Sequence, residues 1–181
     1  LTQSNGTLTT NGSLTVNGSL NQVGGSTSVA GNTTVVGDTS VSGNTTSGNL
    51  TTTNMNVSGG NTTVVGNSTT SGNLTITGGN TTVSGNTTSG NLTIAGGNTT
   101  MAGNTTVGNL TVAGGNVTSQ GDVTVGNLTQ SNGTLTANSN LTVNGSYNQT
   151  NGTAFVNGTL STVDYTQADG TTTAGALSVA N

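Results

Sequence analysis

Larger side chains recur in pairs two positions apart along most of the chain, and a glycine, alanine or asparagine follows most of these pairs. Leu92 with Ile94 and Thr105 with Val107 are two examples, and in both the residue between them is polar. Because successive side chains of a β-strand point to opposite faces, this alternation predicts short strands with one inward face. The small residue after each pair predicts a corner at which the chain turns into the next strand.

Between residues 71 and 128 this pattern occurs in three nearly identical copies of 18 residues. The copies read SGNLTITGGNTTVSGNTT, SGNLTIAGGNTTMAGNTT and VGNLTVAGGNVTSQGDVT. Three strands and three corners per copy predict a triangular, parallel β-solenoid, in which each strand pairs with its counterpart one turn along. We expect an all-β, single domain over residues 1–181, of about ten turns and roughly 48 Å in length. The uneven corners favour a right-handed coil but leave the handedness open.

Residues 18 apart should stack as columns inside the coil. One core column is expected at Leu74, Leu92, Leu110, Leu128, Tyr147 and Tyr165. One residue is added at a corner before Tyr147, where it need not shift a strand. The neighbouring column is expected to continue as a glutamine ladder at Gln130, Gln149 and Gln167. Stacked amides can hydrogen-bond to one another along the axis, and the alternative interpretation is that these glutamines face water.

Residues 26–56 fit more than one register, because their valine and methionine residues can be aligned in several ways. The distance from Leu20 to Leu74 is nevertheless 54 residues, or three turns of 18. This spacing favours a continuous coil through the ambiguous segment.

The sequence LTQSNGTLT at residues 1–9 recurs unchanged at residues 128–136, which indicates a longer array of which this chain is an excerpt. Residues 161–181 are less regular, and we expect them to form a modest cap or an interface. Neither end resembles the polar cap of a monomeric solenoid. Unpaired strand edges therefore predict axial continuation, either within a longer chain or by head-to-tail stacking of copies into a filament.

The composition removes most catalytic and binding chemistry. The 181 residues include no Lys, Arg, His or Cys, and the only acidic residues are Asp38, Asp122, Asp164 and Asp169. The chain therefore lacks a general base near neutral pH other than a carboxylate, and it lacks a basic surface for nucleic acid. Four scattered carboxylates do not form a calcium-binding array. We expect no enzymatic activity, no catalytic residue, no cofactor, no metal, no nucleic-acid partner and no membrane insertion.

Most asparagines lie in Asn-x-Ser/Thr triplets, which are acceptor sites for N-glycosylation. The candidate sites in the most regular part of the chain are Asn73, Asn80, Asn86, Asn91, Asn98, Asn104, Asn109, Asn116 and Asn127. A strand that begins with Asn and carries an outward Thr generates the same triplet without any glycan, so both interpretations stay open. Outward threonine rows also allow an ice-binding or glycan-binding solenoid as an alternative function.

The repeated NLTV, GNTTV and TVNGS units with Gly/Asn corners resemble the β-solenoid repeats of filamentous-haemagglutinin-type adhesins and of phage tail fibres. The resemblance implies a non-enzymatic structural fibre or adhesin shaft that is extracellular or displayed at a cell surface. Some pairs also resemble the hexapeptide pattern of left-handed β-helix acyltransferases. Those enzymes depend on a histidine that this chain lacks, so this second resemblance implies a shape and no activity.

Overall fold

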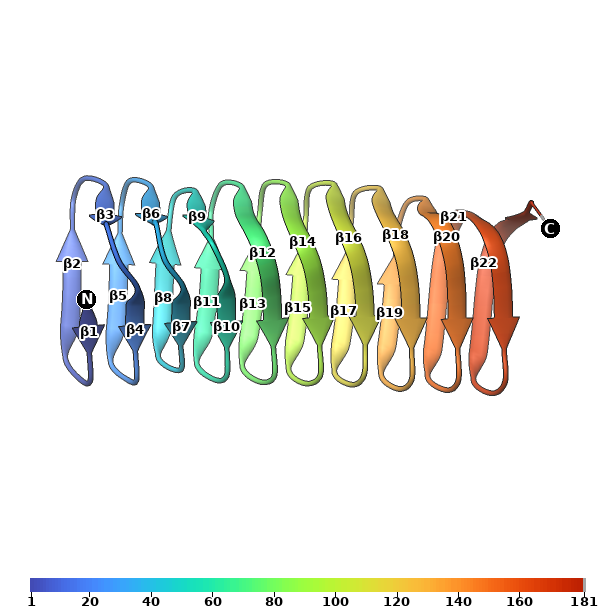
Figure 1. Ribbon diagram of the computed structural model, residues 1–181, viewed down its shortest axis with the longest axis horizontal. Coiled ribbons are helices and arrows are strands. Elements are labelled where there is room, and N and C mark those ends of the chain that lie inside the picture. The colour runs from blue at the N-terminus through green and yellow to red at the C-terminus, as the bar shows by residue number, and fades with distance from the viewer. Residues whose placement is uncertain (181) are drawn as a thin grey trace.

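Twenty-two strands form one continuous sheet, and all of their pairings are parallel. The computed structural model describes residues 1–180, and within this range the sheet winds into a β-solenoid of about ten turns with no helix. Figure 1 shows the turns stacked along one axis, with the two ends of the chain at opposite ends of the rod. The expected fold class and the expected pairing of each strand one turn along are confirmed.

After β1 (Thr2–Gln3), the first three turns each contain three short strands. These are β2 (Thr7–Thr10), β3 (Leu14–Val16) and β4 (Leu20–Gln22), then β5 (Ser26–Val29), β6 (Thr33–Val35) and β7 (Thr39–Val41), then β8 (Asn44–Ser47), β9 (Leu50–Thr52) and β10 (Met55–Val57). Each strand alternates inward and outward residues, as the pairs of large side chains predict.

From residue 61 onward the second and third strands of each turn join into one long strand. The strands in this part are β11 (Asn61–Val64), β12 (Ser68–Ile76), β13 (Asn80–Val83), β14 (Thr87–Ile94), β15 (Asn98–Met101), β16 (Thr105–Val112), β17 (Asn116–Ser119), β18 (Val123–Gln130), β19 (Thr134–Ala137), β20 (Leu141–Gln149), β21 (Thr153–Gln167) and β22 (Thr171–Val179). In β12 a register shift between Thr70 and Asn73 marks the place where the third corner of a triangle was expected. That corner is therefore a bulge, at which a strand bends without ending.

Turn length varies in the segment whose register the sequence leaves open. Thr39 stacks on Leu20 after 19 residues, Met55 on Thr39 after 16, and Leu74 on Met55 after 19. The three turns sum to 54 residues, so the coil is continuous although no single turn here has 18. The irregular turns place Val35 inside and leave its neighbour Val36 exposed.

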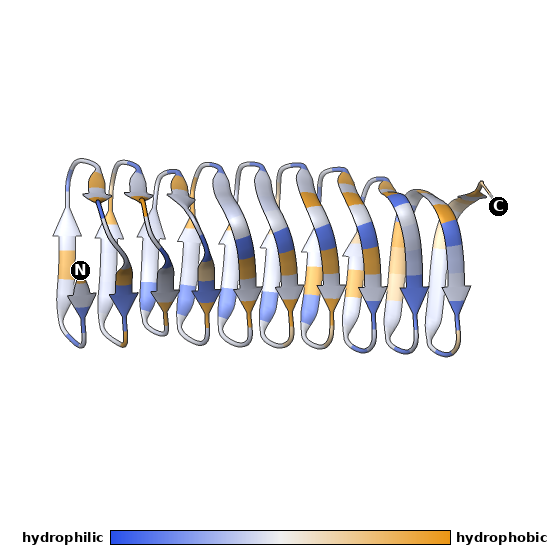
Figure 2. Cartoon of the chain, viewed as in Figure 1, coloured by the Kyte–Doolittle hydropathy of each residue, from blue (hydrophilic) through white to orange (hydrophobic). Residues whose placement is uncertain are grey.

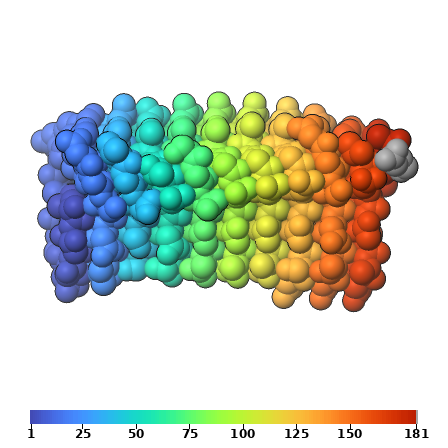
Figure 3. All heavy atoms as spheres, in the orientation of Figure 1, coloured from blue at the N-terminus to red at the C-terminus, as the bar shows by residue number. Residues whose placement is uncertain are grey.

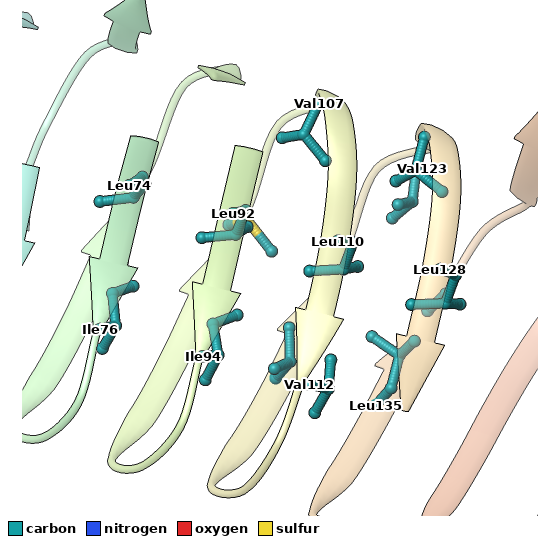
Figure 4. Close-up of a cluster of buried hydrophobic side chains, with 14 of the residues drawn as sticks. Leu74, Ile76, Leu92, Ile94, Val107, Leu110, Val112, Val123, Leu128 and Leu135 are labelled. Atoms are coloured by element: carbon teal, nitrogen blue, oxygen red, sulfur yellow. The ribbon is translucent and has the colours of Figure 1, made fainter. Parts of the chain in front are cut away.

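The stacked columns form the core. Leu74, Leu92, Leu110 and Leu128 are in register and buried, and Figure 4 shows them on successive strands. Figure 2 shows hydrophobic and hydrophilic residues recurring at similar heights from turn to turn. Because each turn is too thin to bury its own inward face, the apolar side chains are covered only by the turns above and below.

Glycine at one corner is required by two independent constraints. Gly79, Gly97 and Gly115 stack at the turn after the third strand segment, and their φ angles are 72°, 72° and 70°. A Cβ atom on Gly97 would also lie 2.1 Å from the carbonyl oxygen of Gly79. The positive φ disfavours any L side chain, and the close stacking of turns leaves no room for one.

Residues 161–180 continue the coil rather than departing from it. Leu160 pairs with Leu141 and Leu177 pairs with Leu160, so β21 and β22 keep the register of the preceding turns. Asn181, the last residue of the expected irregular segment, lies outside the described residues.

Candidate functional site

The nine candidate glycosylation asparagines are all exposed, and the fold sorts them into three columns. The bulge column contains Asn73, Asn91, Asn109 and Asn127. The strand column contains Asn80, Asn98 and Asn116, each at the start of a first strand. The corner column contains Asn86 and Asn104, together with Asn67 before them and Asp122 after them. Figure 3 shows the atoms of the outer surface in regular rows that follow the stacked turns.

In the bulge and strand columns the side-chain amides bond to one another. The Nδ2 of Asn91 donates to the Oδ1 of Asn73 at 2.9 Å, and that of Asn109 donates to Asn91 at 2.8 Å. In the strand column the Nδ2 of Asn98 donates to the Oδ1 of Asn80 at 3.0 Å. These chains of bonds run parallel to the axis, so they reinforce the contact between turns at the surface.

The corner column is bonded in a different way. The Oδ1 of Asn86 accepts the backbone N–H of Asn104 at 2.9 Å, and the Oδ1 of Asn67 accepts that of Asn86 at 2.8 Å. Across the described chain, the Nδ2 of these corner asparagines makes no hydrogen bond to protein. The nitrogen to which an N-linked glycan is attached is therefore free of protein contacts only in this column.

Asp122 occupies the corner column where its neighbours are asparagines. Its Oδ1 accepts the Ser139 hydroxyl, the backbone N–H of Asn140 at 3.1 Å and the Nδ2 of Asn140 at 3.2 Å. The Ser139 hydroxyl, and after it the Asn140 backbone, hold the pKa of Asp122 below its usual value. The carboxylate is thus held in a structural role by donors from the next turn.

One outward column consists of hydroxyl side chains without interruption. It lies at the centre of the second strand segment of each turn, where strand residues alternate inward, outward and inward. Its members are Thr15, Thr34, Thr51, Thr69, Thr88, Thr106, Thr124, Thr142, Ser161 and Ser178. A similar row on the first strand segment is broken by Phe155, which lies between Thr136 and Thr173. The solenoid therefore carries one regular threonine row along its whole described length.

A shallow groove of about 480 Å³ lies where the 16-residue turn meets its neighbours. Its lining includes Asp38, Asn54 and Asn73 from the column at the third corner, and Ser40 and Thr75 from the strand beside it. The carboxylate of Asp38 accepts the Nδ2 of Asn54 at 2.8 Å. The groove offers neutral donors and acceptors with one carboxylate, which suits hydroxyl-rich ligands better than charged ones.

The predicted glutamine ladder is in register, and its first two members are buried. Gln130 stacks on Gln149 and Gln149 stacks on Gln167, but Gln167 is exposed. The expected bonds between the amides themselves are absent from the described chain. Instead, the Nδ2-equivalent nitrogen, Nε2, of Gln149 donates to the carbonyls of Gly152 and Thr171, each at 3.1 Å. The interior glutamines therefore bind the corner of their own turn to that of the next.

Two tyrosines complete this polar part of the core. The hydroxyl of Tyr147 donates to the Oε1 of Gln130 at 2.8 Å, and that of Tyr165 donates to Gln149 at 3.2 Å. The two rings lie 5.0 Å apart between centroids. Tyr147 is fully buried, whereas Tyr165 is only half-buried because no described strand covers it. Burial raises the pKa of Tyr147 to about 12.

The sequence analysis missed two further glutamines with the same role. Gln22 is buried, and its Nε2 donates to the carbonyls of Gly25 at 3.3 Å and Asn44 at 2.7 Å. Gln3 makes the equivalent pair of bonds in the first turn. The signal was present, because LTQSNG occurs at residues 1–6 as well as at residues 128–133.

Known chemistry offers few further constraints. Among the described residues, no group of three or more acidic, His or Cys side chains could hold a metal ion. The described part of the chain also contains no helix that is long and apolar enough to cross a membrane. No protein-family model, curated protein or solved structure matches the chain. The functional argument therefore depends on the geometry of the columns alone.

Proposed function

We propose that this chain is a non-enzymatic structural segment of an extracellular fibre or adhesin shaft, which extends along the solenoid axis. The observation that carries the proposal is the repetition of one cross-section along the whole described length. All turns contribute backbone bonds and interior columns in the axial direction, so length is added without a larger core. The absence of Lys and Arg leaves no site for trypsin-like proteases, which suits a protein exposed outside the cell.

The two ends of the coil support axial continuation. β2 and β3 at one end and β22 at the other pair with described strands on one side only. Residues 1–9 have the same sequence as residues 128–136, and the latter stack in register on the turn before them. The first turn therefore has the side chains to accept another turn of this kind, whether from the same chain or from a second copy.

Electron microscopy of the 181-residue polypeptide tests this proposal. We expect straight rods that are longer than a single copy and that lengthen with protein concentration. A matched variant, Leu14→Asp, places a charge at the exposed edge of the first turn and should shorten the rods. Particles of one-copy length at all concentrations would contradict self-association by this polypeptide.

A second candidate function, ice binding, is favoured by the uninterrupted threonine row on the second strand segment. Its hydroxyl and methyl groups repeat every ~4.8 Å along the axis, and the row is uncharged. Thr88→Tyr with Thr106→Tyr would disrupt the centre of the row. Thr82→Tyr with Thr100→Tyr would change the opposite row as a control. Thermal hysteresis that is lost only in the first pair would support ice binding, and no hysteresis in the parent protein would exclude it.

Glycan binding is the remaining alternative, and the groove beside Asp38 is the feature that favours it. A carboxylate, amides and hydroxyls at one place can form several hydrogen bonds with a sugar. Binding of neutral oligosaccharides that is lost in Asp38→Asn would support this alternative. Unchanged binding in that variant would place the sugar elsewhere.

N-glycosylation, if the chain carries it, is proposed to be concentrated in the corner column. Asn86 and Asn104 leave Nδ2 free, whereas the bulge and strand columns use Nδ2 as an axial donor. An intact mass of native material tests this proposal. A mass equal to that of the bare chain removes it, and glycans on Asn91 rather than on Asn86 contradict the proposed selectivity.

A further inference from the structure

Two Asn-Gly pairs at one corner have an unusual local geometry. The backbone nitrogen of Gly133 lies 2.8 Å from the Oδ1 of Asn132, the residue just before it. The nitrogen of Gly152 lies 2.7 Å from the Oδ1 of Asn151. In both pairs the side-chain carbonyl group is folded back onto the peptide bond that follows it.

This contact places a nucleophile beside an electrophile. The nitrogen of Gly133 and the Cγ of Asn132 are the two atoms that must join to close a five-membered imide ring. Reacting groups that are held in contact need little further ordering to react. Glycine adds no side chain that would hinder the approach, and Gly133 and Gly152 have φ angles of 75° and 90°.

We propose that Asn132 and Asn151 are sites of spontaneous deamidation through a succinimide. The glycine nitrogen loses its proton to solvent and bonds to Cγ, and the Cγ–Nδ2 bond breaks as ammonia leaves with a proton from water. Water then opens the imide at either carbonyl, which gives aspartate or isoaspartate. The net reaction consumes one water molecule and releases one ammonia at each site, and it needs no other reactant.

The corner position makes both nitrogens available. Among the described residues, the N–H of Gly133 and that of Gly152 bond only to the preceding side chain, while their carbonyls accept from the next turn. Asn132 and Asn151 are exposed, so water and hydroxide reach them. The same corner has one residue fewer between Val41 and Asn44 than between Val57 and Asn61, so it tolerates a change in backbone length. The extra methylene of isoaspartate can therefore be accommodated there.

A third Asn-Gly pair in the same region provides an internal control. The backbone nitrogen of Gly158 donates to the carbonyl of Ser139 at 3.1 Å, one turn away. Attack on Asn157 would have to break this axial bond, and both residues lie within the continuous strand β21. Asn157 should therefore react much more slowly than Asn132 or Asn151.

The product has a counterpart in the same column. Asp169 stands where Asn132 and Asn151 stand in earlier turns, and the nitrogen of Gly170 lies 2.7 Å from its Oδ1. A carboxylate at this corner is thus compatible with the fold. Reaction at both asparagines would change the formal net charge from −4 to −6 and add two carboxylates beside Asp169.

The experiment is incubation of the intact polypeptide at mildly alkaline pH, followed by intact mass spectrometry and fragmentation of the whole chain. Fragmentation of the intact chain is needed because there are no Lys or Arg cleavage sites. We expect mass gains of about 1 Da at Asn132 and Asn151, at rates at least about tenfold above that at Asn157. Isoaspartate is measured independently by enzymatic methylation.

Three variants sharpen the result. Asn132→Ser with Asn151→Ser should remove the two early mass gains, and Asn157→Ser should leave them unchanged. Circular dichroism verifies that each variant keeps its β-sheet content. The proposal is overturned if Asn157 reacts as fast as the corner pairs, or if the corner pairs stay intact while a short unstructured Thr-Asn-Gly-Thr peptide is fully converted.

Discussion

The turns near the two ends of the described chain differ from the central turns in one interior column. In the outer turns this column holds Gln3, Gln22, Gln130, Gln149 and Gln167, and in the central turns it holds Val41, Val57, Ile76, Ile94 and Val112. The backbone pairing is the same in both regions. The difference therefore isolates what an interior amide does in a coil of this width.

The amide decides whether an inward threonine has a hydrogen-bond partner. Thr27 and Thr45 donate to the Oε1 of Gln3 and Gln22, which lie in earlier turns. In the central turns Thr62, Thr81 and Thr99 occupy the same column, and their buried hydroxyls have no partner. The comparison teaches that the backbone of this coil does not satisfy an inward hydroxyl, because only the glutamine turns supply an acceptor.

The largest expected effect is the loss of an interior glutamine. Gln22→Leu should lower the free energy of unfolding by about 3 kcal/mol, because it leaves the Thr45 hydroxyl and the carbonyls of Gly25 and Asn44 without their partner. Urea denaturation measures the change. Gln167→Leu is the matched control, because Gln167 is exposed, and its effect should be much smaller. Equal effects would show that burial of the amide does not matter.

The second prediction concerns alkaline pH, which should weaken only the end with buried tyrosine. Burial raises the pKa of Tyr147 to about 12, above its ordinary value near 10. Between these values the unfolded state has lost its proton and the folded state has not, so stability falls as pH rises. The loss should be about 1.4 kcal/mol per pH unit. Tyr147→Phe should flatten this dependence in urea titrations between pH 10 and pH 12, and an unchanged slope would contradict the assignment.

The third prediction is a change of sign between the two regions. Thr81→Val should raise the free energy of unfolding by about 1 kcal/mol, because it removes a buried hydroxyl that has no partner. Thr45→Val should lower it by about 1 kcal/mol, because it leaves the Oε1 of Gln22 without a donor. The chain already has Val117 and Leu135 in this column, so an apolar side chain fits. Destabilisation by both substitutions would indicate that the central hydroxyls have partners in solution.

The smallest effect is expected outside the coil. Asn91→Ala breaks its amide bonds to Asn73 and Asn109, but water replaces both partners at this exposed column. The free energy of unfolding should fall by about 0.5 kcal/mol in urea denaturation. A loss as large as that of Gln22→Leu would mean that the outer columns, not the interior amides, hold adjacent turns together.

Much of the fold followed from spacing, and the exceptions have physical causes. The 18-residue period was sufficient to place Leu74 and Leu92 in one column, because identical turns stack in one way. It could not show that the third corner becomes a bulge, since Gly72-Asn73 is compatible with either a corner or a bent strand. It also could not locate the 16-residue turn, because the 19-residue turns on either side of it restore the total of 54.

The candidate site was less accessible to sequence reasoning. The spacing aligned Gln130 with Gln149, but the choice between amide partners and turn carbonyls depends on where the corner of the next turn lies. In the same way, an Asn-x-Thr triplet does not reveal whether Nδ2 faces a neighbour, as in Asn91, or solvent, as in Asn86. Both outcomes depend on side-chain directions that are set only when the turns stack.

The uneven turns have a consequence for how the chain finds its alignment during folding. A coil built only of identical 18-residue repeats could pair one whole repeat out of place and still bury leucine on leucine. The 16-residue turn between Thr39 and Met55 and the 19-residue turn between Leu128 and Tyr147 prevent this, because they fit only their own neighbours. A chain shifted by one repeat would also place Gln130 beside Ile94 rather than Gln149, with its amide away from the corner carbonyls. These irregular turns act as registration marks that give a repetitive sequence one native alignment.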